Sequence, residues 1–151
     1  MVIRRACPDE APLLSDLALR SKAYWGYSAE FIAACRDDLT LSEAFIRETE
    51  VFVSEDSAGK IAGFYALDRK ADGIADLNDL FVDPASIGGG HGRALFEHAI
   101  QLARSQGCRE MRIDSDPFAE PFYQKMGAER MGEVESTVFP GRMLPLLRVL
   151  L

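Results

Sequence analysis

Long apolar runs are missing from this sequence, and basic residues are in the minority. No run approaches the about 20 residues that a membrane-spanning helix needs. The first five residues are followed by acidic, helix-forming sequence, which is not typical of a signal peptide. Only 17 Lys and Arg stand against 24 Asp and Glu, so the net charge is −7. These features predict a cytoplasmic protein without a membrane partner and without a nucleic-acid partner.

Cysteine is also scarce. The three cysteines, Cys7, Cys35 and Cys108, form no CxxC pair, and an odd number cannot pair completely into a disulfide framework. We therefore expect them to be reduced thiols in the core. The 151 residues are 48% hydrophobic, which is ample for one core, so residues 1–151 are expected to form a single domain.

The periodicity of apolar residues predicts an α/β protein. Adjacent strands favour antiparallel pairing, and one strand–helix–strand unit in the second half favours a parallel crossover. The expected fold is a mixed, mostly antiparallel central sheet of about six to seven strands with helices on both faces. Helices are predicted over 8–24, from 28, over 42–48, from 92 to 107 and over 118–126. Strands are predicted over 2–6, 51–55, 61–67, 74–82, around 111–113 and twice within 128–151.

One glycine-rich segment carries most of the chemical information. Gly88, Gly89, Gly90 and Gly92 lie between a predicted strand end and a predicted helix start. Glycine allows positive φ and lets a ligand approach the backbone without meeting a Cβ. The free N–H groups of the helix's first turn would then face the opening. The segment predicts a phosphate or pyrophosphate site rather than a merely flexible turn.

Two common nucleotide-binding loops do not match this segment. A dinucleotide fingerprint needs Gly or Ala at its sixth position, but that position is Arg93 counted from Gly88 and Leu95 counted from Gly90. A Walker loop ends in Gly-Lys-Ser/Thr, whereas Gly92 is followed by Arg-Ala. Both motifs are therefore excluded.

The segment resembles the signature of the GCN5-related N-acetyltransferase (GNAT) superfamily. In that family a strand ending in V-x-P is followed by R/Q-x-x-G-x-G/A at a helix start, and the match here runs from Val82 to Leu95. A second match, from Pro121 to Ala128, is similar to the family's FYxKxGF segment. The resemblance covers nearly the whole chain and implies the GNAT fold. It departs at Ile87, where the family has Arg or Gln, so a side-chain contact to pyrophosphate is missing.

The resemblance implies an acetyl-CoA-dependent N-acetyltransferase that acts by direct transfer. Acetyl-CoA would be the cosubstrate, with its pyrophosphate on backbone amides of the glycine segment and its pantetheine arm along the preceding strand. The implied cofactor-binding residues are Phe81, Val82, Gly88, Gly89, Gly90, Gly92, Arg93 and Ala94.

The same resemblance gives candidates for catalysis. Tyr123 matches the family's general acid for the CoA sulfur, and this role is favoured over a hydroxyl that is packed for structure or stacked on the cofactor. Asp76 and Asp79 lie on the strand where many members place a carboxylate, and either could be the general base or a solvated strand carboxylate. The two have opposite parity, so they should face opposite sides of the sheet. Some members use a water chain instead of a dedicated base.

Metal and covalent chemistry have little support. His91 and His98 could share a helix face, but no Cys or carboxylate set stands at ligand spacing around them, so we expect no metal. No G-x-S-x-G elbow exists, and Cys108 has no evident partner.

The acceptor is expected to be a small molecule with a primary amine. In this family the first two helices and their connection usually cover the acceptor pocket, and here that connection carries Tyr24, Trp25 and Tyr27. These rings could line the pocket or fasten the loop to the core. Arg142 could be structural, or it could reach the acceptor or a partner subunit. The apolar run 144–151 leaves a homodimer open, and a buried central strand explains it equally well.

Two rival functions remain at this point. The first is a non-catalytic module that binds acyl-CoA and regulates another process. The second is a dinucleotide-binding oxidoreductase, which the failed fingerprint disfavours.

Overall fold

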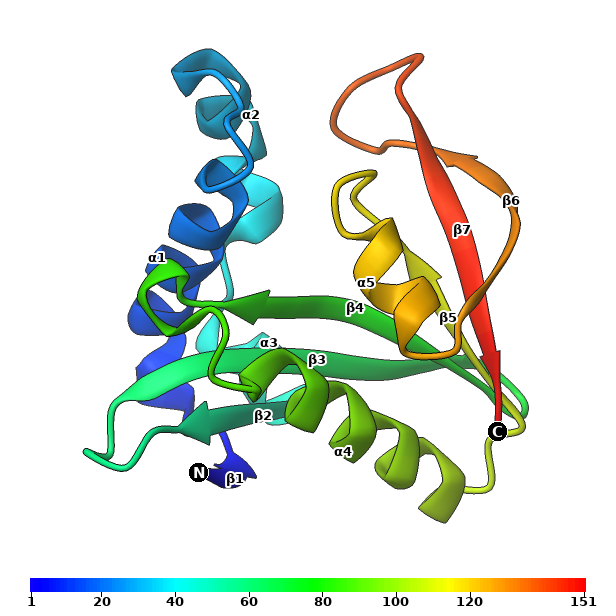
Figure 1. Cartoon of the computed structure of the whole chain (residues 1–151), viewed down its shortest axis with the longest axis horizontal. Coiled ribbons are helices and arrows are strands. Elements are labelled where there is room, and N and C mark those ends of the chain that lie inside the picture. The colour runs from blue at the N-terminus through cyan, green and yellow to red at the C-terminus, as the bar shows by residue number, and fades with distance from the viewer. The chain divides into compact units, whose positions relative to one another are not determined.

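The computed structural model describes residues 1–151, apart from the side chain of Lys70, and its central feature is a seven-stranded sheet (Figure 1). The strand order is β1-β2-β3-β4-β5-β7-β6. The β4–β5 pair is parallel, whereas the β1–β2, β5–β7 and β6–β7 pairs are antiparallel. The strands are β1 (Val2–Arg5), β2 (Glu50–Glu55), β3 (Ile61–Ala71), β4 (Ile74–Val82), β5 (Glu110–Asp114), β6 (Glu129–Glu135) and β7 (Met143–Leu150). The predicted mixed sheet is confirmed.

The helices begin largely where the sequence predicts them. Ser28 and Ser42 cap their helices, and their hydroxyls accept hydrogen bonds from the amides of Phe31 and Phe45 at 3.1 and 3.0 Å. The helices are α1 (Ala11–Ala23), α2 (Ala29–Leu39), α3 (Glu43–Glu48), α4 (His91–Ser105) and α5 (Glu120–Lys125).

The first helix starts later than predicted. Residues Pro8–Glu10 form a separate 3-10 turn, and α1 begins at Ala11. Pro12 has no N–H to donate to the carbonyl of Pro8, so the α-helical hydrogen bond between these two positions cannot form. The amide of Ala11 instead donates to the carbonyl of Pro8.

The chain divides into two compact units. The first comprises Met1–Ala66 and Asp79–Glu97, and the second comprises Leu67–Asn78 and His98–Leu151. By these limits, β3, β4 and α4 each run through both units.

The core of the first unit lies on β2, β3 and α1. Residues 61–66 are buried at every position, so both faces of this part of β3 are covered, as expected for a sheet with helices on both faces. Leu14 and Leu17 of α1 and Val53 of β2 are completely buried in the same unit.

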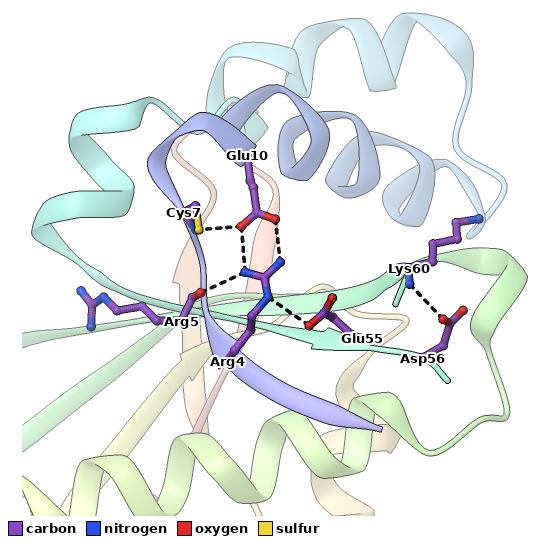
Figure 2. Close-up of polar contacts among 7 residues, drawn as sticks. All are labelled: Arg4, Arg5, Cys7, Glu10, Glu55, Asp56 and Lys60. Carbon is purple, nitrogen blue, oxygen red and sulfur yellow. Dashed lines mark hydrogen bonds and ion pairs between the residues drawn. The ribbon is translucent and has the colours of Figure 1, made fainter. Parts of the chain in front are cut away.

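A side-chain network fastens β1 in the first unit (Figure 2). Arg4 donates to both carboxylate oxygens of Glu10, at 3.0 and 2.8 Å, and to Glu55 at 3.0 Å. Glu10 also accepts from the amide of Cys7 at 2.7 Å. The hydrogen bonds from Arg4 outweigh the effect of burial and lower the pKa of Glu10.

In the second unit, β7 is an interior strand. It pairs with β5 on one side and β6 on the other, for example Met111 opposite Val149 and Val134 opposite Leu144. Leu147 of β7 and Met111 of β5 are completely buried. The apolar run 144–151 thus forms an interior strand of the sheet in which alternate residues, among them Leu147 and Val149, are buried.

The cysteine prediction was partly wrong. Cys35 and Cys108 are buried free thiols, but Cys7 is exposed because it lies in the turn between β1 and the 3-10 segment rather than in the core. Among the residues that the structure describes, no helix is both long enough and apolar enough to cross a membrane.

Candidate functional site

The glycine loop follows β4 in the first unit and leads into α4. Gly88 and Gly90 have φ of 90° and 83°, a region that side chains other than glycine rarely adopt. A Cβ at Gly88 would meet no atom within 4 Å, so positive φ rather than crowding explains this glycine. The positive φ angles at Gly88 and Gly90 are therefore the backbone conformations that glycine at these two positions predicts.

The first turn of α4 presents amides at the end of this loop. The first helical hydrogen bond runs from the amide of Ala94 to the carbonyl of Gly90, at 3.1 Å. The amides of His91, Gly92 and Arg93 precede that bond and have no carbonyl of the helix to pair with. Together with the positive end of the helix dipole, they suit an anion such as pyrophosphate. Of the predicted donors, Ala94 is already engaged within the helix.

Close packing fixes the strand that feeds the loop. A Cβ on Gly63 of β3 would lie 2.7 Å from the carbonyl oxygen of Phe81 and 3.0 Å from Leu95. Only glycine lets β4 and α4 approach β3 this closely. Gly63 was not predicted to shape the site, although a glycine inside a predicted strand is a known sign of close backbone approach.

A buried pair joins the start of α4 to the sheet. Ser54 Oγ on β2 and His91 Nδ1 lie 2.6 Å apart, and the two residues are 0% and 7% exposed. The His91 ring also lies against Gly89, whose Cβ would be 3.2 Å from a ring carbon. His91 is thus part of the support of the loop, a role that the sequence analysis did not predict.

A second buried contact holds the other end of the loop. Asp83 follows β4 directly, and its Oδ2 lies 2.8 Å from a guanidinium nitrogen of Arg20 on α1. Its Oδ1 accepts a hydrogen bond from the amide of Ala85 at 3.0 Å. Ile87, the position that departs from the family pattern, is half exposed at the surface of the same loop.

The two candidate general bases fall into different units. Asp79 lies in the first unit and is half-buried. Protein atoms surround its carboxyl group, and the resulting desolvation raises its pKa to about 7. The negative charge of Asp38 on α2 adds to this rise. Asp76, in the second unit, lies opposite Arg112 in the parallel β4–β5 register. A carboxyl that titrates near pH 7 suits a general base at neutral pH.

Tyr123 lies on α5 in the second unit. It is 6% exposed, and its ring makes an edge contact with Phe122, with centroids 5.3 Å apart. The helix that carries it ends at Lys125, and Gly127, with φ of 103°, follows the cap residue Met126. In the same unit Arg142 pairs with Asp116 at 3.8 Å, which favours its structural role.

The aromatic residues between α1 and α2 are not alike. Tyr27 stacks on Phe31 with centroids 4.0 Å apart, and the Lys22 ammonium lies 5.5 Å from the Tyr27 ring centroid. Tyr24 and Trp25 are 57% and 39% exposed and contact each other edge to face. Tyr27 therefore fastens the loop, while Tyr24 and Trp25 present ring surface to solvent.

His98 lies in the second unit, whereas His91 lies in the first. Burial lowers the pKa of His98. Across the described part of the chain, no group of three or more His, Cys, Asp or Glu residues could hold a metal ion.

Comparisons with known sequences give one family. A model of the acetyltransferase (GNAT) domain matches residues 13–138. Glucosamine 6-phosphate N-acetyltransferase of Trypanosoma brucei brucei is 33% identical over 85 residues, a match that covers 52% of this chain and 57% of the relative. The chain thus spans little more than half the length of that curated relative.

Solved structures share the fold over almost the whole chain. A GCN5-related N-acetyltransferase from Rhodopseudomonas palustris matches with a TM-score of 0.82 and 20% identity, covering 99% of this chain and 95% of that one. PaiA N-acetyltransferase from Thermoplasma acidophilum, solved with coenzyme A, matches with a TM-score of 0.81 and 18% identity, covering 99% and 98%. These likenesses confirm the expected fold.

Proposed function

This chain belongs to the GNAT acetyltransferase family, and we propose that it transfers the acetyl group of acetyl-CoA directly to a primary amine of a small molecule. The observation that carries the proposal is the glycine loop, with positive φ at Gly88 and Gly90 and with the amides of the first turn of α4 preceding the first helical hydrogen bond, from Ala94 to Gly90. A relative with the same fold binds coenzyme A, which supports acetyl-CoA as the cosubstrate.

We propose that the loop amides bind the pyrophosphate of acetyl-CoA. The donors are those of Gly88, Gly90, Gly92 and Arg93, because the amide of Ala94 already donates to Gly90 within the helix. Gly89 contributes its small size, since any Cβ there would press on the His91 ring. The backbone of Phe81 and Val82 at the end of β4 would pair with the pantetheine arm, as a sheet edge accepts an added strand.

The proposed chemistry needs one base and one acid. The ammonium group of the acceptor first gives one proton to Asp79, and the neutral amine nitrogen then attacks the thioester carbon. The carbon–sulfur bond breaks, the Tyr123 hydroxyl gives its proton to the leaving thiolate, and the second proton of the nitrogen passes to solvent. Asp79 is preferred to Asp76 because its pKa, raised to about 7 by desolvation, matches neutral pH.

The proposed acceptor carries a positive charge before it reacts. Asp38 and Asp79 place negative charge on the first unit, and Tyr24 and Trp25 offer exposed rings that attract cations.

The net charge of −7 disfavours nucleic acid and anionic membranes as partners. We further propose a cytoplasmic protein in which residues 1–151 act as one domain, because three elements run through both units. A homodimer stays a prediction, for which the interior strand β7 gives no support.

Two measurements test the function. Calorimetry should detect acetyl-CoA binding, and a panel of primary amines should accelerate release of the CoA thiol. Tyr123→Phe should keep acetyl-CoA binding and lower kcat by about 100-fold, whereas Tyr65→Phe, at a buried tyrosine of β3, should leave kcat unchanged. Binding without any thiol release would instead favour a non-catalytic acyl-CoA-binding module. Thermal stabilisation by NAD but not by CoA would favour a dinucleotide-binding protein and overturn the proposal.

A further inference from the structure

Asp83 is the point at which β4 becomes the glycine loop, and hydrogen bonds fix it on every side. Its amide donates to the carbonyl of Ala62 at 2.7 Å, and its carbonyl accepts from the amide of Ser86 at 2.8 Å. One carboxylate oxygen accepts from the amide of Ala85, and the other pairs with Arg20. Three of these four contacts are local or belong to the neighbouring strand. Only the one with Arg20 reaches a helix.

The Arg20 contact is the buried half of a two-carboxylate arrangement. Arg20 lies in the last turn of α1 and pairs both with Asp16, one helical turn earlier, and with Asp83, at 2.9 and 2.8 Å. The Asp16 side chain is 68% exposed, whereas that of Asp83 is 4% exposed. The Arg20 side chain is itself 44% exposed, so only the carboxylate of the Arg20–Asp83 pair is buried. Loss of Arg20 leaves this buried carboxylate without its cation, whereas the exposed pair with Asp16 contributes little to stability. The buried Asp83 therefore depends on the Arg20 guanidinium for its charge compensation more than the exposed Asp16 does.

The charge state of Asp83 agrees with this geometry. Burial acts to raise the pKa of its carboxyl, but the hydrogen bonds from Arg20 and from the amide of Ala85 outweigh burial and lower it. The hydrogen bond that Arg20 donates to Asp83, and then the one that it donates to Asp16, raise the pKa of Arg20. The pair is thus ionised at neutral pH.

We propose that Arg20 is a positioning residue for the cosubstrate, and that its ion pair with Asp83 holds the start of the glycine loop at the geometry that binds pyrophosphate. The proposal rests on the proposed function. Backbone amides bind an anion well only when they are fixed in advance, because ordering them on binding costs free energy. Through this contact α1 also supports the glycine loop of the same unit. The same helix leads into the segment that carries Tyr24 and Trp25.

The matched variants are Asp83→Asn and Asp16→Asn. Asparagine at 83 can still accept the hydrogen bond from Ala85, so this variant removes the ion pair and keeps the turn. We expect Asp83→Asn and Arg20→Met each to raise the KM for acetyl-CoA about tenfold with little change in kcat. Arg20→Lys should recover part of that loss, and the double variant should be no worse than either single one. Asp16→Asn should behave like the wild type.

A further control separates positioning from general stability. Glu10→Gln removes an ion pair elsewhere in the first unit, with Arg4, which belongs to β1 and not to the glycine loop. It should lower the melting temperature without changing the KM for acetyl-CoA. If Asp83→Asn raises KM no more than Glu10→Gln does, the proposed role of Arg20 is wrong.

Amide hydrogen exchange makes the inference independent of turnover. Measured without acetyl-CoA, exchange over residues 83–92 should be faster in Asp83→Asn and Arg20→Met than in Asp16→Asn or Glu10→Gln. Equal exchange in all four variants would overturn the inference. A wild-type protein that does not bind acetyl-CoA would contradict the proposed function instead, and the exchange data would still decide whether the ion pair holds the loop.

Discussion

The Ser54 hydroxyl and the His91 imidazole are buried 2.6 Å apart, and through them β2 is joined to the first residue of α4. The amides proposed to bind pyrophosphate belong to this same turn. A side-chain pair beneath the loop therefore fixes the direction in which backbone donors point, which is the usual way that a binding site is made rigid.

Removing the Ser54 hydroxyl should loosen this turn. Ser54→Ala leaves a nitrogen of the buried His91 without its partner, at a cost of about 1–3 kcal/mol in the free energy of unfolding. We also expect weaker acetyl-CoA binding by calorimetry. Ser15→Ala is the matched control, because Ser15 Oγ on α1 likewise bridges two segments, donating to Ala11 and accepting from the amide of Leu41. It should lose stability and keep its affinity; an equal loss of affinity in both variants would contradict the role given to His91.

A methyl group at Gly63 should displace the end of β4. Its Cβ would lie 2.7 Å from the backbone oxygen of Phe81, which cannot move without the strand. We expect Gly63→Ala to lower the free energy of unfolding by about 1–3 kcal/mol in urea titrations and to weaken acetyl-CoA binding. Gly132→Ala in β6 is the control, since a Cβ there meets nothing within 4 Å. Unchanged affinity in a folded Gly63→Ala protein would show that the end of β4 does not position the cosubstrate.

The parts predicted correctly from the sequence depend on neighbours along the chain. The caps at Ser28 and Ser42 and the positive φ of Gly88 and Gly90 follow from residue type and from the few residues around each position. The local pattern failed at the start of α1, where Pro8–Glu10 form a separate 3-10 turn, and at Cys7, which is exposed.

The missed parts of the site are contacts between distant segments. Ser54 and His91 are 37 positions apart, and neither has a residue type that predicts a partner. The strand parity of Asp79 likewise gives no information about its burial or about Asp38, which lies on another element. Such contacts arise from how the elements pack, which the periodicity of one segment does not specify.

Acid should destabilise the protein through Glu10. Its pKa is lowered in the folded state, chiefly by the hydrogen bonds from Arg4, so its stabilising effect is complete above the ordinary pKa of about 4.3 and is lost as the pH falls through the folded value. Glu10→Gln should therefore flatten the acid side of the stability curve, measured by urea unfolding between about pH 3 and 7. Glu43→Gln, which removes a partner of the exposed Arg47 on α3, should leave that slope as in the wild type. Equal slopes for all three proteins would contradict the role of the Arg4 network.

The activity should rise with pH through the titration of Asp79. A general base works only when ionised, and desolvation raises the pKa of this carboxyl to about 7. We expect kcat/KM for acetyl transfer to increase tenfold per pH unit below about pH 7 and to level off above it. In Asp79→Asn this limb should disappear and the plateau should fall, while Asp76→Asn should keep the limb. An unchanged limb in Asp79→Asn would assign the titration to the amine or to a water chain.

The same carboxyl should affect stability with the opposite sign to Glu10. Because the folded pKa of Asp79 lies above its ordinary value of about 3.9, the folded protein holds a proton between about pH 4 and 7 that the unfolded chain has lost. The free energy of unfolding should therefore fall as the pH rises through this window, and Asp79→Asn should remove that fall. If Asp79→Asn loses both the pH dependence of kcat/KM and the pH dependence of the free energy of unfolding, the titration of this one carboxyl explains both. Loss of the kinetic limb with the slope intact would show that Asp79 is needed for transfer but does not titrate near pH 7 in the free protein.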